Sequence, residues 1–274
     1  MYRQRFSLNG HPLPKNAQGK TFYDKSPGYK KLGRAFQQLI KDPGLGVLTA
    51  DAGAGKTAAI RNLCAQLPHP DYLVLYFCDT AVSPLDLYRT LANDLGVRAS
   101  HRRAQLWTDI KKALVHMVDE RGTAPVVIVD EAQHLSDRFL IDLSGFLNFA
   151  FDSRDLLTLW LVGLPPLNRH LKMQQHAALA MRVVHQVHLE PLDRDGFNAL
   201  IDHGLKAAGA NEKLISDPAR ELLYRASRGV PRVASKLLRA ALTEAHERNQ
   251  NFVDDHVMEA AVENMPFQAA VAAA

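Results

Sequence analysis

A glycine-rich segment between an apolar run and a helical pattern is the first place where this chain could do chemistry. Residues 49–57 read T-A-D-A-G-A-G-K-T. Glycines let backbone amides curl around an anion without Cβ clashes, and the N-terminus of the following helix adds partial positive charge. In such a loop Lys56 reaches the β- and γ-phosphates of a nucleotide, and the Thr57 hydroxyl binds Mg²⁺. The pattern predicts a phosphate-binding loop with these contact residues: Ala52, Gly53, Ala54, Gly55, Lys56, Thr57 and Ala58.

The loop departs from the usual pattern G-x-x-x-x-G-K-[ST] at its first position, which is Ala50 here. By itself the segment therefore leaves a chance glycine-rich turn open. A second signal lies 74 residues beyond Lys56, where the apolar run Pro125–Val129 ends in Asp130 and Glu131. Acids at a strand end also cap helices by chance, but a carboxylate pair suits Mg²⁺ binding by Asp130 and polarisation of an attacking water by Glu131. The two signals together predict binding of ATP with Mg²⁺.

Two arginines extend this set. Arg182 precedes an apolar strand pattern, and Arg232 lies in S-R-G-V-P-R at the expected start of a helix. A guanidinium can donate two hydrogen bonds to phosphate oxygens and keeps its charge at every relevant pH. Each alone is more often an ordinary surface arginine, so their interest depends on the elements that carry them.

Those elements alternate between strands and helices in the first two thirds of the chain. Strand patterns are expected at residues 47–49, 73–77, 126–129, 157–162 and 183–189, with helical patterns between them. Such alternation predicts a mainly parallel sheet covered by helices on both faces. Four helices are then expected at residues 194–204, 217–227, 231–247 and 254–263. We predict an N-terminal arm with the first helix at 1–43, an α/β core at 44–190, a small all-helical region at 191–266 and a frayed tail at 267–274.

Charge is distributed unevenly along the chain. Residues 1–34 hold eight basic side chains and one acid, which leaves that segment at +7 and the rest of the +4 chain at −3. A basic arm on a slightly acidic body suggests a polyanionic partner, although a solvated arm without a partner has the same composition. No apolar stretch is long enough to span a membrane, and two cysteines are too few for a disulfide framework. We expect a cytoplasmic protein with buried thiols.

The motifs resemble those of AAA+ ATPases, most closely the ExeA-type branch and the transposition ATPases of the TnsC and TniB kind. The most specific stretches are D-E-A-Q-H-L at 130–135 and R-G-V-P-R at 228–232, and the resemblance covers nearly the whole chain. It implies an AAA+ core with a C-terminal helical lid. It also implies that Arg182 is an arginine finger acting on a neighbouring subunit's ATP, with Arg169 as a weaker candidate. Arg232 would be the sensor 2 residue that contacts the γ-phosphate in its own subunit.

One position departs from that family. Such ATPases usually place a polar sensor 1 side chain after the fourth strand, where this chain has Gly163-Leu164-Pro165. Leucine has no hydrogen-bonding group with which to orient water. We therefore expect ATP binding to be intact and ATP hydrolysis to be slow or dependent on a partner.

The resemblance implies a DNA-binding ATPase that forms rings or filaments on duplex DNA and helps a transposase, together with a targeting protein, to select a site. The basic residues expected to face DNA are Lys30, Lys31, Arg34, Arg102, Arg103 and Lys111. For Arg102, Arg103 and Lys111 the alternative is an exposed helix face that has no partner. Two other functions stay open. One is a secretion-linked ExeA-type ATPase, disfavoured because this chain ends where its membrane and cell-wall-binding parts are expected. The other is an ATP-gated scaffold with little turnover.

Overall fold

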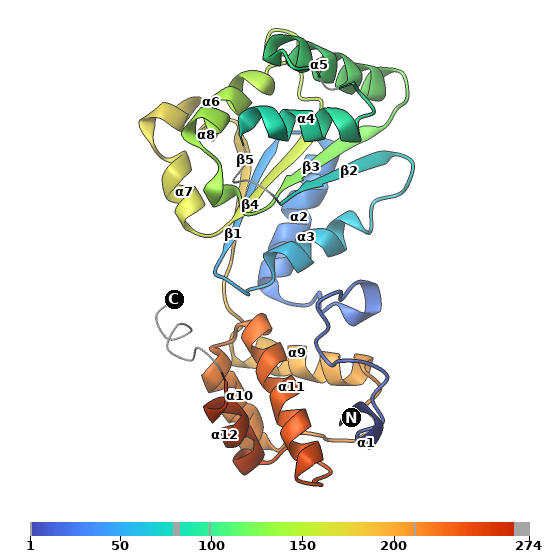
Figure 1. Cartoon of the computed structure of the whole chain (residues 1–274), viewed down its shortest axis with the longest axis vertical. Coiled ribbons are helices and arrows are strands. Elements are labelled where there is room, and N and C mark those ends of the chain that lie inside the picture. The colour runs from blue at the N-terminus through green and yellow to red at the C-terminus, as the bar shows by residue number, and fades with distance from the viewer. Residues whose placement is uncertain (1, 79–82, 99, 211, 266–274) are drawn as a thin grey trace. The chain divides into compact units, whose positions relative to one another are not determined.

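The computed structural model describes residues 2–78, 83–98, 100–210 and 212–265, and its elements are labelled in Figure 1. The strands are β1 (Leu45–Ala50), β2 (Tyr72–Phe77), β3 (Ala124–Val129), β4 (Thr158–Gly163) and β5 (Val183–Leu189). The α-helices are α1 (Tyr2–Arg5), α2 (Pro27–Lys41), α3 (Lys56–Cys64), α4 (Pro84–Asp94), α5 (Arg103–Asp119), α6 (Asp137–Phe146), α7 (Pro166–Leu171), α8 (Ala177–Ala180), α9 (Arg194–Ala207), α10 (Asp217–Ser227), α11 (Pro231–Glu247) and α12 (Asp255–Glu263). Short 3₁₀ turns are η1 (Gly19–Thr21), η2 (Ala132–His134) and η3 (Gln174–His176).

The sheet has the order β2-β3-β4-β1-β5, and every neighbouring pair is parallel. Each of the five predicted strands is present, so the predicted α/β fold with a parallel sheet is confirmed. Because the strands are parallel, their carboxyl ends lie along one edge of the sheet. That edge carries Ala50, which leads into the glycine-rich loop, as well as Asp130 after β3 and Leu164 after β4.

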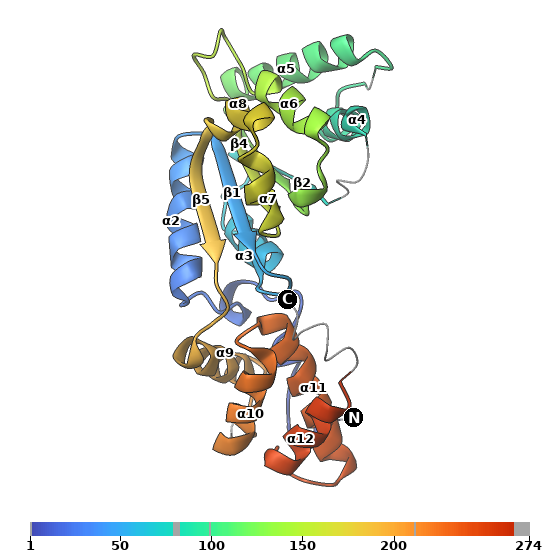
Figure 2. The ribbon, with the colours of Figure 1, turned by 90° about the vertical axis from the view of Figure 1, so that its left-hand side faces the viewer.

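Helices pack on both faces of the sheet because every strand is rich in apolar residues. On one face, β1 to β4 share a buried core with α4, α5 and α6. On the other face, Phe36 of α2 stacks on Trp160 of β4 at a centroid distance of 6.2 Å, and Figure 2 shows α2 beside β5 and β1. Gly46 leaves room for this indole, since a Cβ there would lie 2.7 Å from the Trp160 ring. The sheet is thereby covered on both faces, as parallel sheets require.

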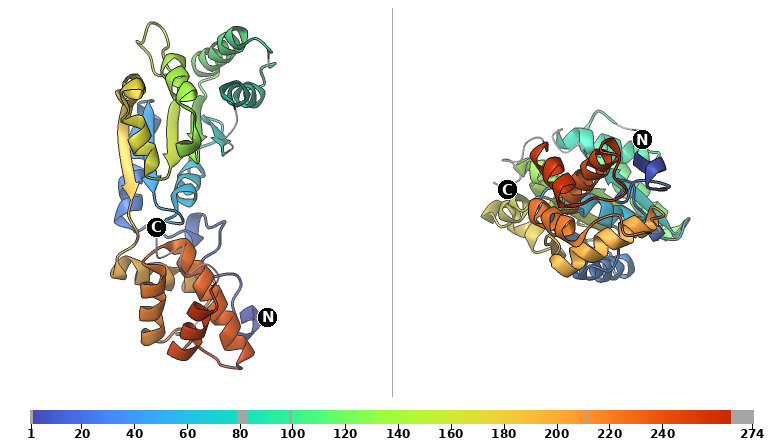
Figure 3. Two further views of the ribbon diagram at one scale, coloured as in Figure 1. Left: turned by 60° about the vertical axis from the view of Figure 1, so that its left-hand side comes forward. Right: turned by 90° about the horizontal axis from the view of Figure 1, so that it is seen from below.

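Contacts divide the chain into two compact units. One holds residues 30–50 and 63–189, including the whole sheet. The other holds residues 2–29, 51–62 and 190–265, whose C-terminal helices α9–α12 gather in one bundle (Figure 3). The units divide at residues 29/30 and 189/190, with the N-terminal segment in the same unit as the C-terminal helices, and the predicted boundaries were 43/44 and 190/191.

The N-terminal segment, which we predicted to be a basic arm, packs against the C-terminal helices. Tyr2, Phe6 and Leu8 are buried in the same core as Phe197 and Leu238 of the bundle. These apolar side chains hold the segment against the bundle although its composition is strongly basic. Arg5 adds a hydrogen bond from Nε to the Gln250 carbonyl at 2.8 Å.

The helix boundaries follow local capping rules. Ser216 caps α10 by accepting a hydrogen bond from the Ala219 amide, and Asp254 caps α12 by accepting one from the Val257 amide. The expectation of two buried thiols was wrong for Cys78, which is exposed where the chain leaves the edge strand β2, while Cys64 is partly buried. Within the described residues, no helix is both long and apolar enough to cross a bilayer.

Candidate nucleotide site

The glycine-rich loop has the backbone geometry of an anion-binding turn. Gly53 and Gly55 adopt φ values of +86° and +99°, which L-residues with a Cβ rarely tolerate. The Ala54 amide donates to the Asp51 carbonyl at 3.2 Å, and the Ala59 amide begins the helical ladder of α3 on Gly55. Lys56 is only 7% exposed, and its Nζ donates to the Asp51 carbonyl at 3.2 Å. The loop therefore places a buried ammonium group and the N-terminus of α3 where a phosphate would bind.

Arg232 lies against this loop although it is 179 residues away from Gly53 in the sequence. Its amide donates to the Gly53 carbonyl at 3.2 Å. A Cβ on Gly53 would come within 2.9 Å of the Arg232 Cβ and 3.1 Å of a Val230 methyl group. The fold thus brings the second predicted arginine to the glycine-rich loop within one compact unit.

Gly229 makes this approach possible. It has φ +73°, and a Cβ there would lie 2.0 Å from the Leu192 carbonyl oxygen. The Leu192 amide in turn donates to the Gly229 carbonyl at 3.0 Å. The backbone at Gly229 is therefore held against the backbone at Leu192, just before Pro231 starts α11. This contact fixes the position of Arg232 in the first turn of that helix.

The carboxylate pair lies at the end of β3 in the other unit. Asp130 is 3% exposed and accepts hydrogen bonds from the Tyr76 hydroxyl at 3.0 Å and from the Glu131 amide at 2.9 Å. Burial, and then the Asp130 charge, raise the pKa of Tyr76 well above its usual value, so this hydroxyl stays a donor. Glu131 is exposed and has φ +53°, a left-handed conformation that turns the chain away from the strand.

Gln133 forms hydrogen bonds with both Glu131 and Leu164, the residue after β4. The sequence analysis did not predict this link. Gln133 Nε2 donates to the Glu131 carboxylate at 2.7 Å, while its Oε1 accepts from the Leu164 amide at 2.9 Å. Gly163 admits the amide group, because a Cβ there would lie 2.6 Å from that Oε1 atom. A polar side-chain group from the segment after β3 therefore lies at the Leu164 backbone. Gln133 lies two residues beyond Glu131 in the stretch D-E-A-Q, and this short spacing could have indicated the contact.

Arg182 precedes β5 and pairs with Asp152, from Nη2 to Oδ1 at 2.5 Å. Its side chain is 22% exposed. Lys111 is a second cation close to it: burial first, and then the Arg182 charge, lower the pKa of Lys111. Arg169, the weaker finger candidate, is exposed on α7.

The basic residues predicted to face DNA fall into two groups. Lys30, Lys31 and Arg34 are exposed on α2, a helix without an acidic residue. Arg102 is exposed where α5 begins. The other two residues have partners inside the protein. Arg103 pairs with Asp142 at 2.7 Å and lies over the Trp107 ring, while Lys111 Nζ donates to the Asn148 carbonyl at 2.7 Å.

The two residues predicted to bind Mg²⁺ each present an oxygen ligand. Thr57 lies in the first turn of α3 directly after Lys56, and Asp130 is a buried carboxylate whose neighbours are hydrogen-bond donors. Hydroxyl and carboxylate oxygens are hard ligands of the kind that Mg²⁺ prefers. Thr57 and Asp130 each offer such an oxygen, and the two residues belong to different compact units.

Comparison with known proteins agrees with this geometry. A family model described as an AAA domain matches residues 38–171. General secretion pathway protein A of Aeromonas hydrophila is 28% identical over 252 residues, which cover 92% of this chain and 46% of that protein. The chain thus spans about half the length of this relative.

Solved structures of origin-recognition and branch-migration proteins share the fold. The Aeropyrum pernix ORC2 protein in ADPNP–ADP complexes matches with a TM-score of 0.70 and 15% identity, covering 93% of this chain and 71% of that chain. Drosophila ORC bound to DNA matches with a TM-score of 0.66 and 15% identity, covering 95% of this chain and 65% of that chain. The Thermotoga maritima RuvB branch migration motor matches with a TM-score of 0.63 and 17% identity over 93% and 73%. The chain therefore shares the α/β fold of these solved structures, and residues 38–171 match the model of an AAA domain.

Proposed function

We propose that this chain is an AAA+ ATPase that hydrolyses ATP with water to ADP and phosphate. The glycine-rich loop binds the phosphates, Lys56 neutralises the β- and γ-phosphates, and Arg232 contacts the γ-phosphate in the same subunit. Mg²⁺ held by Thr57 and Asp130 supplies charge neutralisation of the phosphate oxygens. Glu131 accepts a proton from the attacking water, and Gln133 keeps its carboxylate in place.

The observation that carries this proposal is the contact between the Arg232 amide and the Gly53 carbonyl. It joins two motifs that lie far apart in the sequence and that are both expected around one γ-phosphate. Gln133 adds support, since its hydrogen bond to the Glu131 carboxylate fixes where the proposed base lies. The Leu164 position therefore does not exclude hydrolysis, although we expect the basal rate to be low.

We propose further that the chain self-associates and that Arg182 acts on the ATP of a neighbouring subunit. An arginine finger that acts on a neighbour leaves the ATP site of each isolated subunit without one of its catalytic residues. Lys56→Ala and Arg182→Ala should each abolish ATP hydrolysis, but an equimolar mixture should recover part of the activity. In the mixture some interfaces combine an intact loop with an intact finger. Absence of recovery, with both variants folded and able to associate, would place Arg182 outside the site.

Duplex DNA is the partner that we propose, and transposition is the process. The acid-free α2 with exposed Lys30, Lys31 and Arg34 supports DNA binding, as do the relatives whose structures are described as bound to DNA. Such contacts are mainly to phosphates, and they weaken with salt. Fluorescence anisotropy with labelled duplex should show binding that requires ATP, weakens in ADP and falls steeply between low and high salt. Absence of binding with every nucleotide would remove DNA as the partner.

The role as a helper of a transposase and a targeting protein rests on the motif resemblance alone. Addition of an ATP-loaded protein–DNA complex should then stimulate strand transfer by a purified transposase. The A. hydrophila relative favours a second candidate, a secretion-associated ATPase. In that case ATP hydrolysis and self-association should persist while DNA leaves both unchanged.

An ATP-gated scaffold is the third candidate. Glu131→Gln separates it from an enzyme, because the substitution removes the base and preserves the shape of the side chain. If the protein is an ATPase, the variant should accumulate as an ATP-bound assembly. If the protein is a scaffold, the variant should assemble as the unchanged protein does.

A further inference from the structure

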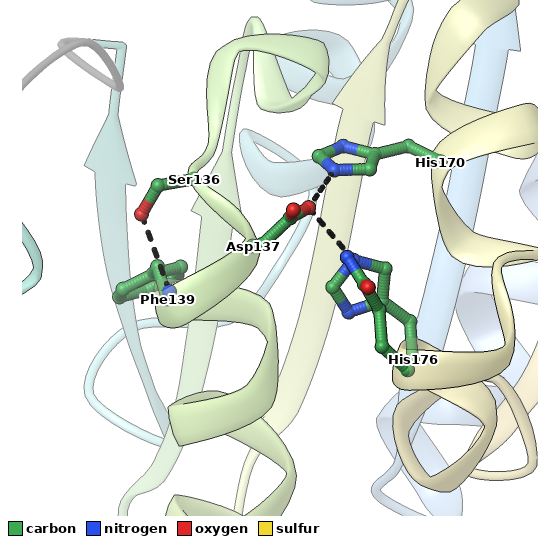
Figure 4. A network of polar contacts seen from close by, with 6 residues as sticks. Ser136, Asp137, Phe139, His170 and His176 are labelled. Atoms are coloured by element: carbon green, nitrogen blue, oxygen red, sulfur yellow. Dashed lines mark hydrogen bonds and ion pairs between the residues drawn. The ribbon is translucent and has the colours of Figure 1, made fainter.

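Three metal-ligating side chains from separate segments converge on one point in the sheet-containing unit (Figure 4). Asp137 is the first residue of α6, His170 lies near the end of α7 and His176 ends η3. Asp137 Oδ1 lies 2.5 Å from His170 Nε2 and 2.9 Å from His176 Nε2. The two imidazole rings meet edge to face with a centroid distance of 5.0 Å.

The cluster is closed on its protein side and open towards solvent. The His176 side chain is 0% exposed, His170 is 20% exposed and Asp137 is 53% exposed. His176 Nδ1 is buried without a hydrogen-bond partner in the described part of the chain, so the polar contacts of this buried ring are made by Nε2. A fully buried imidazole is uncommon, and here Nε2 lies 2.9 Å from Asp137 Oδ1 and 3.3 Å from the Gln175 amide nitrogen.

We propose that Asp137, His170 and His176 bind a divalent transition-metal ion, of which Zn²⁺ suits the ligand set. Two imidazole nitrogens and one carboxylate oxygen are a common three-ligand set for zinc, with water in the remaining position on the solvent side. The ligand atoms all lie within 4.8 Å of one another. The exposed Asp137 side chain can rotate to lengthen its two contacts when the ion enters.

The metal would join two segments that the sheet places next to each other. α6 begins six residues after Glu131, and α7 begins two residues after Leu164. An ion held between α6 and the α7–η3 segment would stabilise the folded form, because the unfolded chain does not present the three ligands together. This inference does not depend on the proposed ATPase activity.

Co²⁺ titration of the tag-free full-length chain, without nucleotide, tests the site. Co²⁺ bound by histidine and carboxylate gives visible absorption bands, which Zn²⁺ then removes by displacement. We expect one equivalent per chain, confirmed by metal analysis after dialysis, and a rise in melting temperature with Zn²⁺. Asp137→Asn and His170→Asn should each weaken Co²⁺ and Zn²⁺ binding by at least about 10–100-fold and abolish the thermal shift.

Two controls make the result specific. His116 pairs with Glu120 at 2.8 Å on an exposed helix face, so His116→Asn removes a similar pair outside the cluster and should leave binding unchanged. Asp119→Asn removes an exposed carboxylate that pairs with Arg154 at 2.7 Å and should also leave binding unchanged. His176→Asn is unsuitable as the main test, because a buried ring is replaced. Absence of Co²⁺ binding by the unchanged chain, or equal binding by His170→Asn, would overturn the proposal and leave a hydrogen-bonded cluster without metal.

Discussion

Arg182 is held by Asp152, a residue of a turn in which three successive non-glycine residues have positive φ. The φ values are 48° at Ala150, 58° at Phe151 and 65° at Asp152. The Phe151 side chain is fully exposed, and Met181 next to Arg182 is 89% exposed. If Arg182 acts on a neighbouring subunit, the Asp152 carboxylate competes with the phosphate for the same guanidinium.

Replacement of Asp152 by Asn should therefore increase ATP-dependent self-association and ATP hydrolysis. A partly exposed ion pair contributes up to about 1 kcal/mol, so the increase should be no more than about fivefold. Sedimentation and steady-state hydrolysis measure it. Asp119→Asn is the matched control, because Asp119 forms a similar ion pair with Arg154 at 2.7 Å. A decrease in both quantities would show that Asp152 supports Arg182 in its active position.

Gln133→Ala should lower the rate of ATP hydrolysis by about tenfold while the affinity for nucleotide changes less than about twofold. The variant loses the hydrogen bond that holds the Glu131 carboxylate and the contact to the Leu164 amide. Turnover at saturating ATP, with a fluorescent nucleotide for affinity, separates the two effects. Replacement of the exposed neighbour His134 by Ala serves as the control. An unchanged rate would mean that Glu131 does not need Gln133.

Gly229→Ala should destabilise the protein by at least about 3 kcal/mol and weaken ATP binding. Alanine at φ +73° is strained, and its Cβ would collide with the Leu192 carbonyl, displacing Arg232. Gly122→Ala is a close control, since Gly122 has φ +64° but a Cβ added there would meet nothing within 4 Å. For Gly122→Ala we expect a loss of folding stability of about 1 kcal/mol. Thermal unfolding compares the two variants, and equal losses would refute a role for the Leu192 contact.

Replacing Lys30, Lys31 and Arg34 together by Gln should weaken DNA binding by at least about tenfold and reduce the salt dependence by about three counterions. The residues lie exposed on an acid-free helix. A variant with Lys112, Arg121 and Lys172 changed to Gln removes the same charge from other positions. Anisotropy at several salt concentrations compares the two variants. Equal effects would assign DNA affinity to net charge rather than to α2.

Iodoacetamide at pH 8 should label Cys78 readily and Cys64 hardly at all. Cys78 is exposed, whereas burial raises the pKa of Cys64 to about 12, which leaves roughly one thiolate in 10,000 at that pH. Mass spectrometry of digested protein locates the label. Both cysteines should react in guanidinium chloride, and rapid labelling of Cys64 in the folded protein would contradict the burial.

The amino-acid sequence by itself determined the local elements. Continuous apolar runs predicted all five strands, and the helical patterns at 217–227 and 231–247 match α10 and α11, because these signals act over a few residues. The glycine-rich loop and the carboxylates at 130 and 131 were also readable, since their chemistry depends on short spacing.

Only the tertiary structure decided which side chains meet. Gln133 and Leu164 are 31 residues apart, Arg182 and Asp152 are 30 apart, and Asp137 lies 33 and 39 residues from its two histidines. Nothing in the spacing of these residues indicates a contact, because the order of the strands and the packing of the helices bring them together. The N-terminal segment shows the same limit. Its composition predicted a basic arm, but the burial of Tyr2, Phe6 and Leu8 depends on a core formed by helices at the other end of the chain.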